Sequence, residues 1–255
     1  MKYFVVTSPV EQNVVVSNFG YRRKNVPQLG FTRWDVLKDK KTDDDKFILV
    51  MPTWREWLES SSEEDFLASD YYNEYVQLLS DERLLKMTDD YNVKLLLYLH
   101  PKFAEHIDSF AEKLSKNIEC ITFGEKPLNE IMMRCHMLIT DYSSVCWDVL
   151  FMDKPVIYYQ FDYDDYMKTH GAYIDMKHNL PSPRTENREE LISLIQEHIE
   201  NGFHIKEEYE EMLRDFYTYR DSSNCKRTYE FLMSSEEGVE FEEDNTPIEG
   251  SAAKS

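Results

Sequence analysis

The chain has 255 residues and a formal net charge of −20, from 49 acidic and 29 basic side chains. A surface of this charge repels polyphosphates, which excludes general nucleic-acid binding, and it disfavours unaided docking on anionic lipid. Apolar residues make up 42%, enough for a substantial core, yet no run approaches the roughly 20 residues of a membrane-spanning helix. The N-terminus is too short for a signal peptide and lacks a small-residue cleavage site, so we expect a soluble protein.

Residues 1–37 contain two short strand-like pieces, at 3–6 and 26–30, with a helical stretch between them that ends near Val16. Residues 38–46 are polar and include three consecutive aspartates, which is typical of a solvated linker. The four cysteines form no Cys-x-x-Cys pair, so neither feature predicts a metal site.

From Phe47 onward, short apolar runs alternate with helical segments. The predicted strands are residues 48–51, 93–99, 118–123, 137–140 and 155–159. The predicted helices are residues 63–85, 103–114, 128–133 and 143–152, with three more between 188 and 233. Runs that are apolar throughout indicate strands covered on both faces. Strand–helix repetition then predicts an α/β fold with a doubly wound parallel sheet.

Polar residues gather at one edge of this predicted sheet. The chain has only seven glycines and lacks both G-x-G-x-x-G and G-x-x-x-x-G-K-[ST], which argues against a nicotinamide site or a P-loop. Ligands of open α/β sheets still bind beyond the carboxyl ends of the strands. The residues that follow strands there include Arg55, His100, Asp141 to Ser144, and Asp162. We interpret this edge as a site for an anion.

Three of these positions also have structural interpretations that the sequence leaves open. Ser143 or Ser144 can cap the next helix and leave backbone N–H groups free for a phosphate, or can act as an ordinary cap. His100 suits a general base or a phosphate ligand, but a lone histidine is more often a satisfied structural group. Arg55 offers a planar fork for phosphate oxygens, or a surface ion pair with a nearby glutamate.

One longer stretch carries a family pattern. It runs from the strand at 138–140 through Asp141-Tyr142-Ser143-Ser144 and a helix to Asp153-Lys154-Pro155 and Asp162. The supporting segments are Pro52-Thr53-Trp54-Arg55, Leu99-His100-Pro101, Gly30 with Arg33 and Asp35, and Asp221-Ser222-Ser223-Asn224-Cys225. Together they resemble the CDP-glycerol glycerophosphotransferase family, which builds wall teichoic acids and related capsule polymers.

The resemblance implies a GT-B architecture, with two Rossmann-like domains facing a cleft and the nucleotide on the C-terminal one. It implies an enzyme that transfers glycerol phosphate from CDP-glycerol, or ribitol phosphate from CDP-ribitol, to a polyol-phosphate or glycan acceptor, releasing CMP. His100 would be catalytic, stabilising charge on the transferring phosphate or assisting proton transfer. The implied donor contacts are Arg55, Thr140, Asp141, Ser143, Ser144, Asp148 and Asp162. No cofactor or metal is implied, and the protein would be cytoplasmic, either free or peripheral at the inner face of the membrane.

The sequence departs from the family in its N-terminal part. The family's W-H-G-T-x-x-K segment, which carries a second essential histidine, is absent. Residues 1–37 therefore match only the end of an acceptor-side domain, and residues 38–234 match the nucleotide-binding domain with its C-terminal helices. Residues 235–255 form an acidic tail without apolar periodicity, which we expect to be disordered.

These departures leave several interpretations open. The chain is a fragment, one part of a split enzyme whose N-terminal half is a separate protein, or an inactive copy. The other functions that fit are a GT-B glycosyltransferase that uses a nucleotide sugar, and a non-catalytic nucleotide-binding partner module.

Overall fold

The structure, a computed structural model, describes residues 2–115 and 118–236. The chain divides into two compact units: one joins Met1–Asp35 to the residues from Asp215 onward, and the other is Val36–Arg214. The division lies two residues before the boundary expected at position 37. The last helix, which the sequence analysis placed with the nucleotide-binding domain, belongs to the same unit as the N-terminal segment. The tail predicted to be disordered lies outside the described residues from position 237 onward.

The unit Val36–Arg214 is built around one sheet of six parallel strands. The strands are β1 (Phe47–Val50), β2 (Lys94–Tyr98), β3 (Ile118–Ile121), β4 (Met137–Thr140), β5 (Val156–Tyr159) and β6 (Arg184–Thr185). Their order is β3-β2-β1-β4-β5-β6, and Ile48 of β1 lies opposite both Leu95 and Met137. The predicted doubly wound parallel sheet is confirmed. The sequence does not predict β6, because its two residues carry no periodicity.

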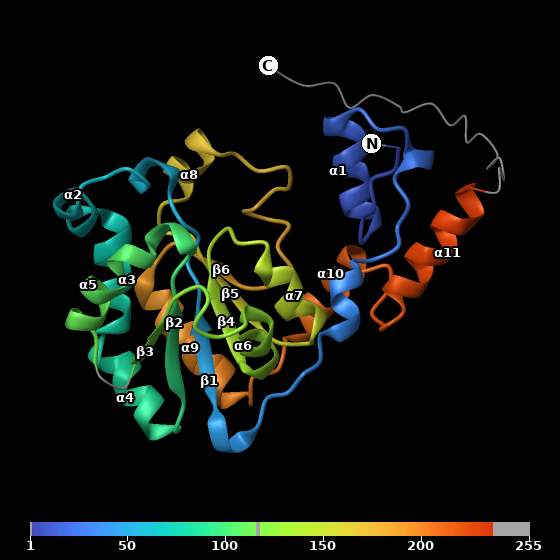
Figure 1. Cartoon of the computed structure of the whole chain (residues 1–255). Helices are drawn as coiled ribbons and strands as arrows, with labels where there is room; N and C mark the ends of the chain where they lie inside the picture. Colours follow the sequence, from blue (N-terminus) through green and yellow to red (C-terminus); the bar gives the residue numbers. More distant parts are fainter. Residues whose placement is uncertain (1, 116–117, 237–255) are drawn as a thin grey trace. The chain divides into compact units, whose positions relative to one another are not determined.

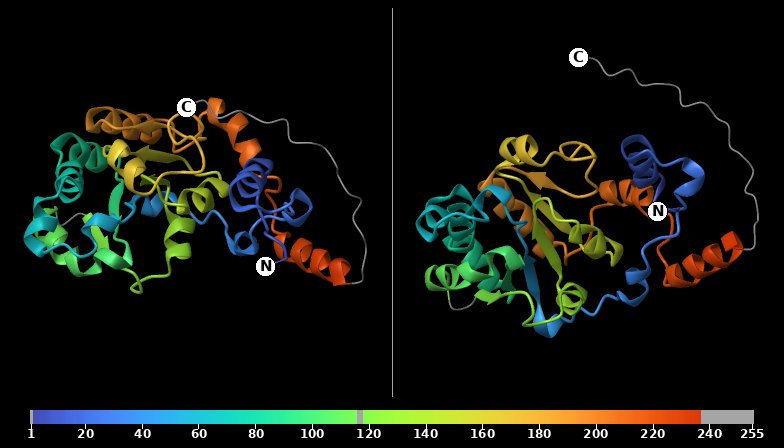
Figure 2. Two further views of the ribbon diagram at one scale, coloured as in Figure 1. Left: turned by 90° about the horizontal axis from the view of Figure 1, so that it is seen from above. Right: turned by 45° about the horizontal axis from the view of Figure 1, so that its top comes forward.

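Helices cover both faces of this sheet (Figure 1, Figure 2). One face carries α3 (Asp70–Leu79), α4 (Glu82–Asp90), α5 (Ile107–Lys113) and α9 (Arg188–Glu200). The opposite face carries α6 (Leu128–Arg134) and α7 (Val145–Phe151). The remaining helices are α1 (Pro9–Phe19), α2 (Glu63–Ala68), α8 (Tyr163–Thr169), α10 (Glu207–Phe216) and α11 (Asn224–Glu236). None of the helices within residues 2–115 and 118–236 is long and apolar enough to cross a membrane.

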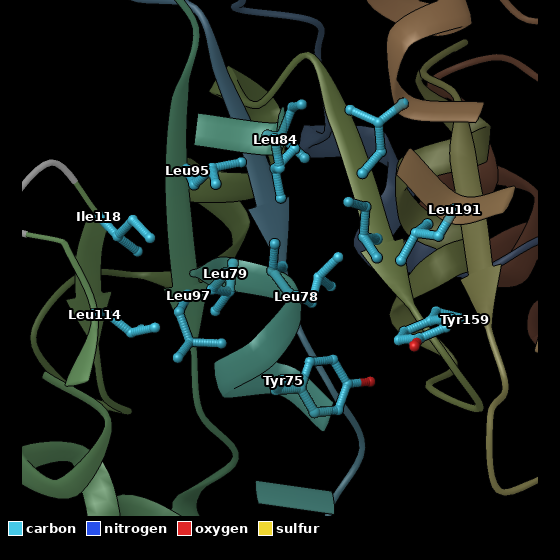
Figure 3. Close-up of a cluster of buried hydrophobic side chains, with 14 of the residues drawn as sticks. Tyr75, Leu78, Leu79, Leu84, Leu95, Leu97, Leu114, Ile118, Tyr159 and Leu191 are labelled. Carbon is cyan, nitrogen blue, oxygen red and sulfur yellow. The ribbon is translucent and has the colours of Figure 1, made fainter. Parts of the chain in front are cut away.

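The main core lies between the sheet and α3, α4 and α9 (Figure 3). Leu95 and Leu97 of β2 point into it, where they meet Leu78 and Leu79 of α3. The strands β1, β4 and β5 are buried along their whole length, as their uninterrupted apolar runs predicted. Burial on both faces follows because helices flank the sheet on each side.

Two expectations about individual elements are wrong. The predicted helix at 63–85 is three helices, because the side chains of Ser69 and Asp81 cap new ones: Ser69 accepts from Tyr72 N–H at 3.2 Å and Asp81 from Arg83 N–H at 3.0 Å. The two strand-like pieces near the N-terminus form only a single bridge, Val6 to Gln28. The helical periodicity of residues 63–85 is present in the structure, but the polar residues that interrupt it set the boundaries between the three helices.

In the N-terminal unit, Asp35 holds the start of α11. Its carboxylate accepts hydrogen bonds from the backbone N–H groups of Asn224 and Cys225, both at 2.8 Å, and from the Asn224 side chain at 2.7 Å. Gly30 lies so close that a Cβ there would be 2.0 Å from Asn224 Oδ1, and its φ of +78° also favours glycine. These contacts give a structural reason for the matching segments around Gly30 and Asp221.

Lys154 is a fully buried lysine that closes the end of α6. Its ammonium donates to the carbonyls of Met132 (3.0 Å), Met133 and Cys135 (2.8 Å), and it pairs with Asp39 at 3.1 Å. The last carbonyls of a helix have no partner within the helix, so an ammonium there satisfies several at once. Burial lowers the pKa of Lys154, although Asp39 offsets part of the effect.

Replacing Lys154 by methionine should therefore lower the free energy of unfolding by about 3 kcal/mol, since it removes the buried donor shared by three carbonyls and the ion pair with Asp39. Urea denaturation followed by circular dichroism measures this. The matched control is Lys94→Met, because Lys94 forms an exposed pair with Asp45 that should contribute little to stability. Equal losses in the two variants would refute the structural role of Lys154.

Candidate functional site

The candidate site lies at the carboxyl ends of the strands, where the strand order reverses between β1 and β4. In open α/β sheets this switch point is the usual place for a ligand. Arg55 follows β1, His100 follows β2, Asp141 follows β4 and Asp162 follows β5. The predicted gathering of these residues at one sheet edge is therefore what the topology produces.

Arg55 lies at the centre of this edge, with its side chain fully buried. Its guanidinium donates to Asp141 Oδ2 from Nη2 at 2.8 Å, and to Asp162 from Nε at 2.6 Å and from Nη2 at 3.1 Å. A further bond runs from Nη1 to the carbonyl of Thr53. The Asp141 side chain is fully buried and that of Asp162 is 12% exposed. One residue thus joins the loops that follow β1, β4 and β5.

This arrangement settles how Arg55 can act. Burial pulls the pKa of its guanidinium down, but the charges of Asp141 and Asp162 outweigh that effect and hold the pKa well above its ordinary value. The alternative of a surface ion pair with a nearby glutamate is wrong. Because the fork is bound to two carboxylates and a carbonyl, Arg55 organises the site instead of presenting a free cation.

The Arg55 cluster has an aromatic surround. Tyr142 donates to Asp162 at 3.1 Å and stacks on Tyr166 of α8, with ring centroids 3.6 Å apart. The centre of the Arg55 guanidinium lies 5.1 Å from the Tyr142 ring and 5.4 Å from the Tyr166 ring. Gln160 donates to the Asp141 carbonyl at 2.8 Å. The only sequence signal for these roles was their position near strand ends.

The other predicted donor contacts fall into buried and accessible groups. Thr140 is buried and donates to the carbonyl of Met51 at 2.7 Å, and Asp148 is buried on α7. Ser143 is half-buried, and its Oγ accepts from Val145 N–H at 3.4 Å. Ser144 is exposed at the start of α7 and makes no capping hydrogen bond with its side chain. Of these four residues, the two serines are the ones that a ligand can reach.

His100 is half-buried, and its ring stacks on Trp54 with centroids 5.9 Å apart. The backbone N–H of Lys102 donates to Nδ1 at 3.2 Å. Burial, followed by the charge of Lys102, lowers the pKa of His100. The residue is therefore a neutral imidazole near pH 7 with its proton on Nε2, because Nδ1 acts as the acceptor.

Replacing Arg55 by lysine should cost about 2–4 kcal/mol of unfolding free energy, since an ammonium cannot bridge both carboxylates and the Thr53 carbonyl. The control is Arg83→Lys, because Arg83 is 53% exposed in its pairs with Asp81 and Glu189 and the exchange should leave stability nearly unchanged. Thermal and urea unfolding of both variants measure the difference. A harmless Arg55→Lys exchange would show that the buried cluster does not hold the loops.

Comparison with known proteins agrees with this architecture. Residues 1–234 match the model of the family described as CDP-glycerol:poly(glycerophosphate) glycerophosphotransferase. The minor teichoic acid biosynthesis protein GgaB of Bacillus subtilis (strain 168) is 28% identical over 242 residues, which cover 90% of this chain and 26% of GgaB. The teichoic acid poly(ribitol-phosphate) polymerase of Bacillus spizizenii is 29% identical over 169 residues, 66% of this chain and 24% of the polymerase.

Among solved structures, the wall teichoic acid polymerase TagF has a similar fold, with a TM-score of 0.67 and 19% identity over 94% of this chain and 59% of TagF. The chain spans about a quarter of the length of the two Bacillus relatives. The family match extends over both compact units and includes the loops that carry Arg55, His100, Asp141 and Asp162. The chain belongs to the CDP-glycerol:poly(glycerophosphate) glycerophosphotransferase family.

Proposed function

We propose that this chain binds CDP-glycerol and serves in the transfer of glycerol phosphate to a hydroxyl acceptor. In the reaction the acceptor oxygen forms a bond to the β-phosphorus, the bond from that phosphorus to the bridging oxygen breaks, and CMP leaves with the electron pair. The proton of the acceptor hydroxyl passes to a base, and from there to solvent or to the released CMP. The observation that carries the proposal is the Arg55 cluster, which fixes the Asp141–Ser144 loop at the switch point in a member of this family.

The roles we assign follow from which groups are accessible. Ser143 and Ser144 would hydrogen-bond the donor phosphates, while Arg55, Asp141 and Asp162 hold the loops in place. Thr140 and Asp148 are both buried, and they would hold the Asp141–Ser144 loop and α7 in position. The net charge of −20 makes this division reasonable, because neutral hydroxyls can bind a phosphate without a strongly basic surface.

His100 is proposed as a hydrogen-bond donor to the transferring phosphate. With Nδ1 accepting from Lys102 N–H, its Nε2–H is the group left to interact with a ligand. Such a donor stabilises charge that develops on phosphate oxygens in the transition state. A neutral imidazole whose acceptor nitrogen is occupied is a poor general base, so the base would come from another residue.

The identities of the donor and the acceptor form part of the proposal. CDP-ribitol is the alternative donor, since one relative is a ribitol-phosphate polymerase. The acceptor would be a polyol phosphate or a glycan. We further propose that acceptor binding requires family N-terminal residues in addition to this chain, either in the same protein or as a separate one.

Calorimetric titration of the chain should show tighter binding of CDP-glycerol or CDP-ribitol than of UDP-glucose. The ratio of the two CDP-polyol affinities identifies the donor. Ser144→Ala should weaken binding of the preferred donor, whereas Ser193→Ala on the exposed surface of α9 should leave it unchanged. Equal or tighter binding of the uridine nucleotide would instead favour a glycosyltransferase.

His100→Ala should reduce transfer by roughly 10²–10³-fold, the usual cost of a lost oxyanion donor. His100→Gln should regain at least part of that loss, because its amide can donate near the position of Nε2, and it should keep the wild-type pH profile. Transfer is measured as CMP release in an assembly that contains the family's N-terminal domain.

His178→Ala, which changes an exposed histidine, serves as the control. If His100 were the general base, glutamine would rescue nothing and the acidic limb of the pH profile would disappear in both His100 variants.

A further inference from the structure

A pocket of about 570 Å³ lies beside the Arg55 cluster, and the proposed function leaves it unused. It is enclosed by the turn Glu56–Leu58, the chain around the start of α3, and α8. All of its lining residues belong to the unit Val36–Arg214. The Asp162 side chain, which binds Arg55, also forms part of its wall. The pocket therefore adjoins the buried cluster that holds the loops of the candidate site.

The pocket has one strongly exposed aromatic side chain and one buried tyrosine in its wall. Trp57 lines it and is 42% exposed, so part of its indole is accessible to a ligand in the pocket. Tyr71 also lines it and is 97% buried, and its Oη has no hydrogen-bond partner in the part of the chain that the structure describes. Because the Tyr71 hydroxyl is buried, Trp57 is the aromatic side chain of the lining that a ligand in the pocket can contact most fully.

The charges around the pocket restrict what can bind there. Four carboxylates, those of Asp65, Asp70, Asp162 and Asp165, line it against a single ammonium, that of Lys168. Lys168 is already paired with Asp165 at 2.9 Å. A phosphate or diphosphate would be repelled by the net negative charge of the lining, so the pocket is not a second binding site for the donor or for a polyol phosphate. Carboxylates do accept hydrogen bonds from hydroxyl groups.

We propose that this pocket binds an uncharged sugar ring of the acceptor. An exposed indole face packs against the C–H face of a pyranose, and the surrounding carboxylates accept from its hydroxyls. An organic cation fits less well, because only one ring of the pocket is exposed and Lys168 stands among the carboxylates. The inference rests on the proposed function only in naming this sugar as part of the acceptor.

Two-dimensional NMR of the full 255-residue chain tests sugar binding without any transfer reaction. The probes are N-acetylglucosamine and methyl β-glucopyranoside, with glycerol 3-phosphate and tetramethylammonium as comparators. We expect the indole N–H signal of Trp57, assigned through Trp57→Phe, to shift on titration with a sugar and not with either comparator. A prior titration with CDP-glycerol tests the proposed function separately.

Matched variants show whether the response belongs to this pocket. Trp57→Ala should weaken sugar binding at least tenfold while CDP-glycerol affinity stays the same, and Trp57→Phe should retain part of it. The control is Tyr91→Ala, a similarly exposed aromatic residue outside the pocket, which should change neither affinity. If no sugar shifts Trp57, or if tetramethylammonium or glycerol 3-phosphate does so instead, the inference is wrong. Intact CDP-glycerol binding would in that case leave the proposed function standing.

Discussion

The guanidinium of Arg55 lies between two carboxylates at the point where the strand order reverses, and the loops of the candidate site depend on it. Taking these charges out of water is costly, and the cost is offset only when the geometry is good and most donors and acceptors are satisfied. Here one planar fork meets Asp141, Asp162 and the Thr53 carbonyl at once. The loops after three strands are therefore joined by a single side chain.

This constraint makes the proposed binding of a phosphorylated donor compatible with a strongly acidic protein. The charge of Arg55 offsets the nearby carboxylates, so the switch point is not a cluster of bare negative charge. The accessible groups around it are the hydroxyls of Ser143 and Ser144 and a neutral imidazole at His100. Such groups act by position and hydrogen bonding, and position is what the buried cluster fixes.

Lys154 and Asp35 show that other family-like segments serve the fold. Lys154 lies within the stretch that resembles the family, yet its ammonium donates to the carbonyls at the end of α6. Asp35 likewise binds the first residues of α11. A pattern of matching residues therefore marks positions that the architecture needs as well as positions that touch a ligand, and only the contacts separate the two kinds.

The sequence by itself determined strands β1 to β5, the parallel sheet and the edge at which polar residues gather, because uninterrupted apolar runs and strand–helix alternation are local properties. It also carried the family pattern around Asp141 and His100. Only the tertiary structure decided the partners of Arg55, which lie 86 and 107 positions away along the chain. It alone brought Trp57 and Tyr71 together with Asp162 around one pocket. Periodicity reports which face of an element is buried, whereas pairing between distant loops depends on how the strands are ordered in the sheet.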